Sequence, residues 1–325
     1  MAEPITTSQF WVISPQNGEI VKAGLSPRLD DELLVRTIYS GVSRGTESLV
    51  FKGKVPRSQY ESMRAPFQEG NFPGPVKYGY SNVGEVVDGP AEFVGRVIFC
   101  LYPHQSRYVV SSNAVIVLPE GLPPERAVLA ANMETAVNVV WDACPGVGDR
   151  IVVIGGGVVG LLAGWLCAQV PGVEVTLVDV NSSRESVASV LGLNFCTEVQ
   201  PHVRADLVIH ASGQPEGLVG ALKVAGMEAT IVEASWYGDG IVQLPLGEEF
   251  HARRLMLKSS QVGQLPSHRT PRWTRAKRLA LALNLLQEPQ LDSLITGESR
   301  FEELPVLMGK LSQGSGSTLC HRIVY

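Results

Sequence analysis

Short apolar runs alternate with longer, helix-like segments through the middle of the chain. The clearest example is residues 150–184, RIVVIGGGVVGLLAGWLCAQVPGVEVTLVDVNSSR. The β-branched run Arg150–Ile154 predicts a strand, and the proline-free run Val158–Val170 after three glycines predicts a helix. A second strand is expected at Val173–Val178, followed at once by Asp179. A dinucleotide-binding βαβ unit has this order of elements: a strand, a glycine turn, a helix, a second strand and an acidic residue.

The same alternation continues after Asp179. We expect a helix at 182–191 and further strands at 207–210, 229–234 and 255–260. Alternating strands and helices predict a parallel, doubly wound α/β sheet. In such a sheet the carboxyl ends of the strands line a ligand crevice. The expected ends carry small or amide-bearing residues, among them Ala211, Ser212, Ser235 and Gln261.

The two ends of the chain have a different texture. Residues 1–118 hold short β-like runs between turns, at 33–40, 81–87, 96–100, 107–110 and 114–117, which predict a compact β-rich domain. Helices are expected at 127–131, 134–143, 274–287 and 301–311, and a final strand at 320–325. We therefore expect a β-rich domain at 1–120, a dinucleotide domain at 121–262, and a return of 263–325 to the first domain.

Each glycine of the turn has a physical purpose. Gly155 permits a tight turn, Gly157 leaves room for a pyrophosphate, and Gly160 lets the helix lie close to the sheet. The phosphates would meet free N–H groups at a helix N-terminus. Asp179, nineteen residues after Gly160, is placed to bind the adenosine ribose and to repel a 2′-phosphate, which favours NAD(H). Arg184 would lie over the adenine or receive that phosphate.

Composition narrows the class of protein. The 325 residues are 45% hydrophobic with a net charge of −5, so nucleic acid and anionic membranes are not expected partners. Residues 151–170 are uncharged and about long enough to cross a bilayer, but the three glycines argue against a span. The five cysteines form no CxxC pair, and the N-terminus shows no targeting signal, so we expect a cytoplasmic protein with reduced thiols.

Several segments together resemble the medium-chain dehydrogenase/reductase family of alcohol-dehydrogenase-like enzymes. They are the β-rich N-terminal half, residues 122–136, Gly148-Asp149-Arg150, the GGGVVG turn and the C-terminal return. The resemblance implies a GroES-like barrel and a Rossmann domain with a small-molecule substrate in the cleft between them. It also implies a homodimer.

Zinc members of that family bind their catalytic metal through three positions. The resemblance places these at Ser43, at Gly79-Tyr80-Ser81 and at Glu134, so only the last keeps a plausible ligand. Because Zn²⁺ needs about three N, S or carboxylate ligands, we expect no metal. An irregular site drawing on Glu47, His104, Glu134 or His251 stays open. The chain is more similar to zinc-free members, and its SRGTE, GYSNVG and YPH segments resemble dehydrogenases related to a bacteriochlorophyllide hydroxyethyl dehydrogenase.

Without zinc, a side chain must stabilise the developing charge on the substrate oxygen and move the proton. Tyr80 is our first candidate, with Lys77 and the nicotinamide cation lowering its pKa. His104 is a candidate proton shuttle, and Thr46 or Ser43 a relay to the ribose. Each also has a plain structural interpretation, as a packed ring, a solvated imidazole or a turn cap.

Further residues complete the predicted site. Glu134 either positions substrate or stabilises a helix start, and Arg44 and Trp236 are candidate substrate contacts, although core packing is the simpler reading of Trp236. The predicted cofactor residues share positions at strand ends or on the glycine turn: Gly155, Gly157, Val158, Val159, Gly160, Asp179, Val180, Arg184, Ala211, Ser212, Ser235 and Gln261.

We therefore expect a zinc-independent NAD-dependent oxidoreductase that interconverts a secondary alcohol and a ketone on a small metabolite. Two alternatives remain. One is a reductase of polarised C=C bonds, in which NADPH is common and an acid at the position of Asp179 is not expected. The other is a catalytically silent cofactor-binding protein.

Overall fold

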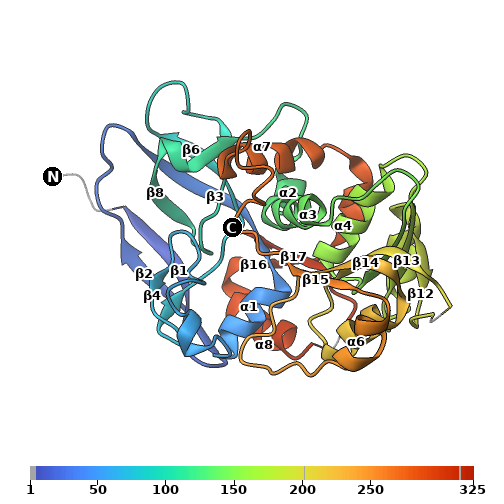
Figure 1. Cartoon of the computed structure of the whole chain (residues 1–325). Coiled ribbons are helices and arrows are strands. Elements are labelled where there is room, and N and C mark those ends of the chain that lie inside the picture. Colours follow the sequence, from blue (N-terminus) through green and yellow to red (C-terminus); the bar gives the residue numbers. More distant parts are fainter. Residues whose placement is uncertain (1–4, 201, 315) are drawn as a thin grey trace. The chain divides into compact units, whose positions relative to one another are not determined.

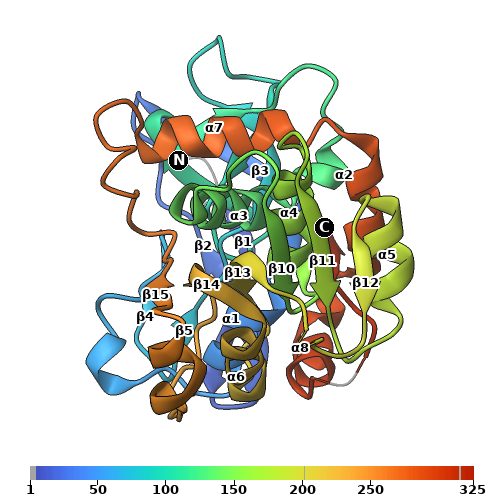
Figure 2. The ribbon, with the colours of Figure 1, turned by 45° about the vertical axis from the view of Figure 1, so that its right-hand side comes forward.

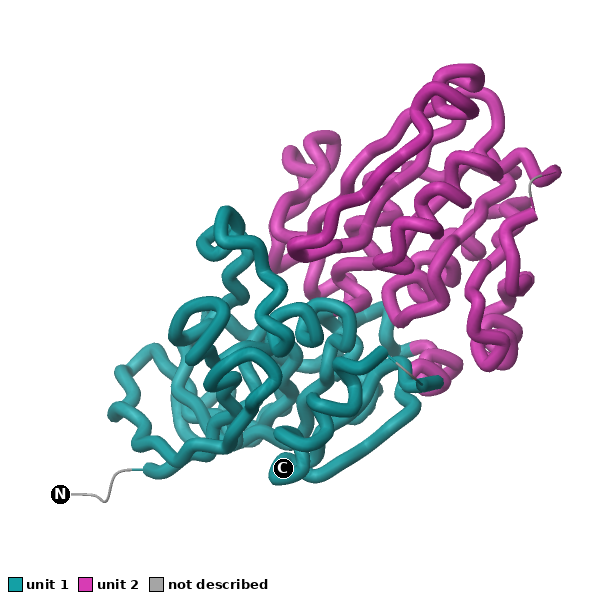
Figure 3. The backbone as a smooth tube through the Cα atoms, turned by 90° about the horizontal axis from the view of Figure 1, so that it is seen from below, with its two compact units in different colours: residues 1–131, 283–287, 295–325 teal, residues 132–282, 288–294 magenta. Residues whose placement is uncertain are grey.

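The computed structural model describes residues 5–200, 202–314 and 316–325 (Figure 1). The chain forms two compact units (Figure 3). Unit 1 comprises residues 1–131, 283–287 and 295–325, and unit 2 comprises residues 132–282 and 288–294.

These borders differ from the expected ones, chiefly in residues 263–282, which belong to unit 2. The reason is helix α7 (Arg275–Leu285), whose Arg278 donates hydrogen bonds to Glu134 and Asn138 of helix α3 (Ala130–Ala143). Trp273, just before α7, also packs on Trp141 of α3 with 4.8 Å between ring centroids. Contacts with α3 therefore hold this segment in the dinucleotide unit.

Unit 2 is built on a six-stranded sheet in the order β12-β11-β10-β13-β14-β15, in which every neighbouring pair is parallel. The strands are β10 (Arg150–Ile154), β11 (Glu174–Val178), β12 (Asn194–Cys196), β13 (Ala205–His210), β14 (Ala225–Glu233) and β15 (Met256–Ser259). Strands β10, β11 and β12 lie side by side in Figure 2. The strand order turns back between β10 and β13, which is where doubly wound sheets bind ligands.

Three helices pack along this sheet: α4 (Val158–Ala168), α5 (Arg184–Val190) and α6 (Pro215–Val224). A core of buried aliphatic side chains from β10, β13, β14 and α6 lies between the layers, with Val208, Ala221 and Ile231 fully buried in it. The uncharged stretch 151–170 is thus a strand, a glycine turn and an 11-residue helix. No helix in the described residues is long and apolar enough to span a membrane.

Unit 1 contains two mainly antiparallel sheets. The larger sheet has the order β16-β17-β3-β6-β7-β9, with β8 also paired to β3, and the smaller one has the order β2-β1-β5-β4. Their strands are β1 (Thr6–Ser14), β2 (Asn17–Gly24), β3 (Glu32–Val42), β4 (Glu69–Gly70), β5 (Val76–Lys77), β6 (Asn82–Asp88), β7 (Val97–Cys100), β8 (Arg107–Ser111), β9 (Val115–Val117), β16 (Ile295–Arg300) and β17 (Cys320–Val324). The unit also holds α1 (Arg44–Phe51), α2 (Pro124–Ala127) and α8 (Leu304–Ser312).

Most expected strands are present within a residue or two, but six were missed: β1, β2, β4, β5, β12 and β16. Strand β2 has no buried residue and β16 alternates between exposed and half-buried positions, so neither carries the apolar run that marks a strand in sequence. The two helices expected at 127–131 and 134–143 are instead a short α2 and one continuous α3. Strand β17 pairs with β3, which ties residues 320–324 to the N-terminal strands.

Candidate functional site

The glycine turn after β10 has the geometry that a dinucleotide requires. Gly155 has a φ of +111°, and a Cβ there would lie 2.5 Å from the backbone nitrogen of Ser212. A Cβ on Gly160 would lie 2.0 Å from the carbonyl oxygen of Gly155, so only glycine lets α4 approach the turn. A Cβ on Gly157 would meet no described heavy atom within 4 Å. The backbone at Gly157 is therefore open to an approaching group.

The start of α4 leaves its amides available. Gly157 is the N-cap residue and, having no side chain, makes no side-chain capping hydrogen bond. Val158 and Val159 follow as half-buried first-turn residues. The first N–H groups of a helix have no partner within the helix, and they attract anions. The residues present here fit a diphosphate.

Asp179 lies just beyond β11 and supports the turn. Its Oδ2 accepts a hydrogen bond from the Gly156 amide at 2.6 Å, and its Oδ1 accepts one from the Asn181 amide at 2.8 Å. Each carboxylate oxygen has a further lone pair, so the group remains able to accept ribose hydroxyls. The next residue, Val180, is 91% exposed, whereas Arg184 is only 4% exposed, and its Cγ would lie 3.1 Å from a Cβ on Gly156. The stem of Arg184 therefore packs against the turn.

The other predicted cofactor residues gather at the same edge of the sheet. Ala211 donates its amide to the Ile154 carbonyl at 2.8 Å, and the Ser235 hydroxyl accepts from the Gly213 amide at 3.1 Å. Ser212 is half-buried beside Gly155, and Gln261 follows β15 at the adjoining strand end. Trp236 is half-buried in the segment after β14. Gly155 and Gln261, 106 positions apart in sequence, thus both follow the carboxyl ends of strands in one sheet, with β13 and β14 between those strands.

Unit 1 gathers a second set of predicted residues around Tyr80. Its phenol is hydrogen-bonded to the side chains of Ser43 and Thr46, which lie at and near the start of α1. Burial and then the charge of Glu47 raise the pKa of Tyr80 to about 12, and the two hydroxyls only partly offset this. The phenol is therefore a proton donor at neutral pH. Arg44, the first residue of α1, is half-buried beside this group in sequence.

Lys77 does not lower the pKa of Tyr80, contrary to our expectation. Its ammonium is fully buried and donates to Glu69 and, at 2.7 Å, to Oε1 of Gln105. Burial lowers the pKa of Lys77 itself, and Glu69 counteracts this. The lysine supports the β4–β5 segment, while the phenol gains no cation from it.

His104 belongs to a buried chain of hydrogen bonds. Its Nε2 lies 2.9 Å from Oε2 of Glu47, and its Nδ1 lies 2.7 Å from the hydroxyl of Ser40. The Ser40 hydroxyl lies 3.0 Å from the phenol of Tyr325. Glu47 also accepts the Ser43 amide at 2.8 Å. The side chains of Glu47 and His104 are only 4% and 1% exposed, so this carboxylate–imidazole pair is shielded from water.

Three members of this hydrogen-bond network, Ser40, Glu47 and Tyr325, were not predicted from the sequence as proton-handling groups. Glu47 had a weak signal, since it lies in the SRGTE segment that carries the family resemblance. Ser40 and Tyr325 had none, because the two residues are 285 positions apart and meet only through the pairing of β3 with β17. The described hydrogen bonds connect Glu47, His104, Ser40 and Tyr325, while the Glu47 charge also acts on the phenol of Tyr80.

The positions that hold zinc in metal-dependent relatives do not fit a zinc ion here. Ser43 and Tyr80 offer hydroxyls, and the Ser81 hydroxyl donates to the Val128 carbonyl at 2.5 Å. Zinc prefers thiolate, imidazole and carboxylate ligands. In the described part of the chain no three His, Cys, Asp or Glu side chains gather as a metal site. Of the residues named for an irregular site, Glu47 and His104 hydrogen-bond to each other and Glu134 pairs with Arg278.

Glu134 forms a buried ion pair. Its Oε1 accepts a hydrogen bond from Nε of Arg278 at 3.1 Å, with the two side chains 7% and 2% exposed. Arg278 also donates to Asn138 and, at 2.6 Å, to the Val262 carbonyl. Burial raises the pKa of Glu134, and the charge and hydrogen bond of Arg278 oppose that rise. The carboxylate joins α3 to α7.

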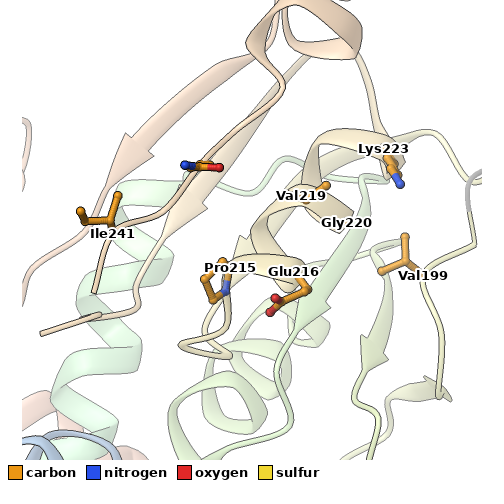
Figure 4. A pocket seen from close by; sticks show the side chains of 8 residues that line it. Val199, Pro215, Glu216, Val219, Gly220, Lys223 and Ile241 are labelled. Atoms are coloured by element: carbon orange, nitrogen blue, oxygen red, sulfur yellow. The ribbon is translucent and has the colours of Figure 1, made fainter. Parts of the chain in front are cut away.

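A groove of about 720 Å³ lies beside α6 on unit 2 (Figure 4). Its walls are mostly apolar, with one acidic and one basic side chain, and are formed by Val199, Pro215, Glu216, Val219, Gly220, Lys223, Ile241 and Gln243. These are different residues from those that sequence analysis singled out. The candidate residues are therefore described as two groups, the strand ends of unit 2 and the Tyr80 group of unit 1.

Comparison with known proteins gives the chain several relatives. No protein-family model matches it. It is 25% identical to D-guloside 3-dehydrogenase of Escherichia coli K12 over 278 residues, covering 77% of this chain and 79% of the relative. It is 30% identical to L-threonine 3-dehydrogenase of Aeromonas salmonicida over 112 residues, covering 34% of this chain and 32% of the relative.

Solved structures resemble the whole chain. L-Idonate 5-dehydrogenase from Escherichia coli K-12 has a TM-score of 0.81 at 13% identity, with 99% of each chain covered. A zinc-binding dehydrogenase from Sinorhizobium meliloti bound to NADP has a TM-score of 0.78 at 16% identity, covering 99% of this chain and 100% of that one. An alcohol dehydrogenase from Escherichia coli CFT073 complexed with NADH has a TM-score of 0.77 at 15% identity, covering 98% and 99%.

The expected fold class is confirmed by these likenesses. The relatives are dehydrogenases of sugar and amino-acid substrates by name, and two of the structural neighbours were solved with NADP or NADH bound. The chain has the two-domain α/β fold of the medium-chain alcohol dehydrogenases.

Proposed function

We propose that the chain is a zinc-independent NAD(H) oxidoreductase that interconverts a secondary alcohol and a ketone on a small polyhydroxylated metabolite. The observation that carries the proposal is the open glycine turn supported by the Asp179 carboxylate. A carboxylate at this place binds the ribose hydroxyls and repels a 2′-phosphate. It therefore favours NAD(H) over NADP(H), although NADP and NADH both occur among the structural neighbours.

The choice of substrate class comes from the relatives. D-Guloside 3-dehydrogenase and L-idonate 5-dehydrogenase are both named for a sugar or a sugar acid. Such a substrate offers ring or chain hydroxyls for hydrogen bonds. Half-buried Arg44 and Trp236 remain our proposed contacts for it.

In this proposal the nicotinamide, when bound, supplies or accepts the hydride. Tyr80 donates a hydrogen bond to the substrate oxygen and then its proton to the developing alkoxide. The raised pKa of the phenol suits this donor role in ketone reduction. Ser43 and Thr46 orient the phenol, and the charge of Glu47 helps to keep it protonated.

Zinc independence is supported by the residue types at the former ligand positions. Hydroxyls stand at Ser43, Tyr80 and Ser81, and Glu134 pairs with Arg278. The test is to purify the protein, measure its metal content, and measure turnover on a panel of polyols, glycosides and their ketones before and after treatment with a chelator. Turnover that needs added Zn²⁺, or NADPH binding tighter than NADH binding, would contradict the proposal.

The C=C reductase and the silent binding protein remain alternatives. An enone panel with no carbonyl turnover would favour the first. NADH binding without turnover on any alcohol, carbonyl or enone would favour the second.

A further inference from the structure

A second buried ionisable cluster lies in unit 2, separate from the Tyr80 group. His210 is the last residue of β13 and is fully buried. It is paired in register with Ile154 at the end of β10 and with Glu233 at the end of β14. Because the strand order turns back between β10 and β13, His210 lies at the edge where a doubly wound sheet binds its ligand.

The imidazole bridges a carboxylate and a hydroxyl. Its Nδ1 lies 2.7 Å from Oε2 of Glu233, and its Nε2 lies 2.6 Å from the hydroxyl of Ser212. An ionised carboxylate can only accept hydrogen bonds, so Nδ1 carries a hydrogen. In the neutral imidazole, Nε2 must then accept the hydrogen of the Ser212 hydroxyl.

The surroundings fix this orientation. Glu233 also accepts the Ser235 amide at 2.6 Å and the Tyr237 phenol at 2.9 Å. A Cβ on Gly217, in the first turn of α6, would lie 2.6 Å from both Nε2 of His210 and the Ser212 hydroxyl oxygen, so the helix closes over the ring. The imidazole ring therefore keeps its orientation, and both hydrogen-bond partners, when it gains a proton.

Glu233 and Tyr237 are the titratable groups that face His210. Glu233 comes from β14 and Tyr237 from the segment after it, whose phenol lies 3.4 Å from Nδ1. Strand β10 contributes the apolar Ile154, and α6 contributes Gly217. Burial raises the pKa of the Glu233 carboxyl, but the hydrogen bond and charge of His210, together with Ser235, hold it below its usual range. Glu233 is thus ionised at neutral pH.

Protonation of His210 has two consequences at the crevice. The Nε2 becomes a donor, so the Ser212 hydroxyl no longer gives its hydrogen to the ring and can donate it to a ligand. The Glu233–His210 pair also changes from a net charge of −1 to zero, which reduces repulsion of an anionic ligand. Ser212 adjoins the Gly155 turn, where a diphosphate is expected.

We propose that His210, backed by Glu233, is a positioning residue for the dinucleotide: its protonated form turns the Ser212 hydroxyl into a donor toward the cofactor, and NADH binds more tightly to that form. The inference rests on the proposed binding of NAD(H). Burying an imidazole–carboxylate pair has a desolvation free energy that an aliphatic pair would avoid. Ionisable pairs of this kind are frequent at functional sites, and this one lies at the ligand-binding edge of the sheet.

The test is to measure NADH affinity by calorimetry from about pH 6 to pH 8.5, the range over which histidine titrates. We expect the dissociation constant of the wild type to increase about three- to tenfold with rising pH, as linkage requires if NADH binds more tightly to the protein with His210 protonated. His210→Gln should remove this dependence. His202→Gln replaces an exposed histidine of the same unit and should leave it unchanged.

A second measurement covers the case in which His210→Gln does not fold. In the NMR spectrum, the His210 imidazole signal is identified as the one that Glu233→Gln shifts. In the wild-type protein, this signal should titrate at higher pH with NADH than without it. An affinity that is constant with pH, an unchanged imidazole pKa, or an unaltered pH dependence in folded His210→Gln overturns the inference alone. A wild type that binds no NADH at any pH overturns the proposed function as well.

Discussion

Replacing Gly157 by alanine should weaken dinucleotide binding without weakening the fold. Gly157 has φ −75° and ψ 174°, an extended conformation that alanine adopts readily. The added Cβ would meet no heavy atom of the described chain within 4 Å, so it would protrude into the space above the turn. Removing the extra freedom of glycine from the unfolded chain should stabilise the protein by about 0.4–1 kcal/mol.

The loss in binding follows from the same open space. If the diphosphate approaches the backbone at Gly157, a methyl group there displaces it from the amides at the start of α4. Hydrogen bonds to charged groups contribute about 1.5–3 kcal/mol each. The loss of one such bond should therefore raise the dissociation constant of NADH by about ten- to a hundredfold.

Two glycines provide matched comparisons. A Cβ on Gly160 would lie 2.0 Å from a backbone oxygen, so Gly160→Ala should destabilise the fold by about 1–3 kcal/mol as well as weaken binding. Gly309 lies in α8 with open space in the described structure around its Cβ position, so Gly309→Ala should stabilise that helix by up to about 1 kcal/mol and leave binding unchanged.

The assay is thermal or denaturant unfolding together with NADH titration by calorimetry. A folded Gly157→Ala protein that binds NADH within about twofold of the wild type would refute the argument. The backbone at Gly157 would then not be the place where the phosphates approach.

Three further predictions concern other side chains. Tyr80→Phe should lower kcat by about 10²–10⁴-fold with NADH affinity unchanged, as measured by steady-state kinetics and titration; full activity would exclude the phenol as proton donor. Arg278→Met should lower the free energy of unfolding by about 3–5 kcal/mol, because it leaves Glu134 buried and unpaired. Adding Glu134→Gln to this variant should recover part of the loss, as measured by denaturant unfolding. Equal stability of the single and double variants would count against the ion pair. The pKa of Glu233 is lower in the folded than in the unfolded protein, so its contribution to stability is present above the unfolded pKa and is lost as pH falls through the folded pKa. Glu233→Gln should therefore flatten the dependence of stability on pH below about 5. An unchanged slope in acid unfolding would contradict this prediction.

The parallel sheet of unit 2 could be predicted well because its signal is local. Strand β10 has the expected bounds, and β11, β13 and β15 each begin or end within two residues of expectation. Strands buried on both faces are continuous apolar runs, which stand out in a sequence. The glycine turn is equally local, since Gly155 needs its positive φ for the strand to pass into α4.

The strands of unit 1 were harder to predict wherever one face or both are exposed. Strand β2 has no buried residue, and its stability comes from pairing with β1. Such a strand has no run of apolar residues to reveal it. The alternating β16 was missed for a related reason, and in unit 2 the three-residue β12 is too short to form a recognisable apolar run.

The candidate site shows the same difference between what is encoded locally and what depends on tertiary packing. Sequence analysis found Tyr80 and His104 as residue types capable of moving a proton, but not the partners that give them that capacity. Glu47 and Ser40 reach His104 from α1 and β3, and burial of the group reverses the expected change in the pKa of Tyr80. Burial and partnership are properties of the packed chain.

By itself, the sequence determined the βαβ unit with its glycine turn and the acid that follows its second strand. These depend on residue order over about thirty positions and on the chemistry of single side chains. Only the tertiary structure decided that Glu134 pairs with Arg278, that Glu47 and His104 share a buried hydrogen bond, and that His210 lies between Glu233 and Ser212. The physical reason is that hydrogen-bond partners and desolvation are set by strand register and helix packing, which join residues that the sequence keeps far apart.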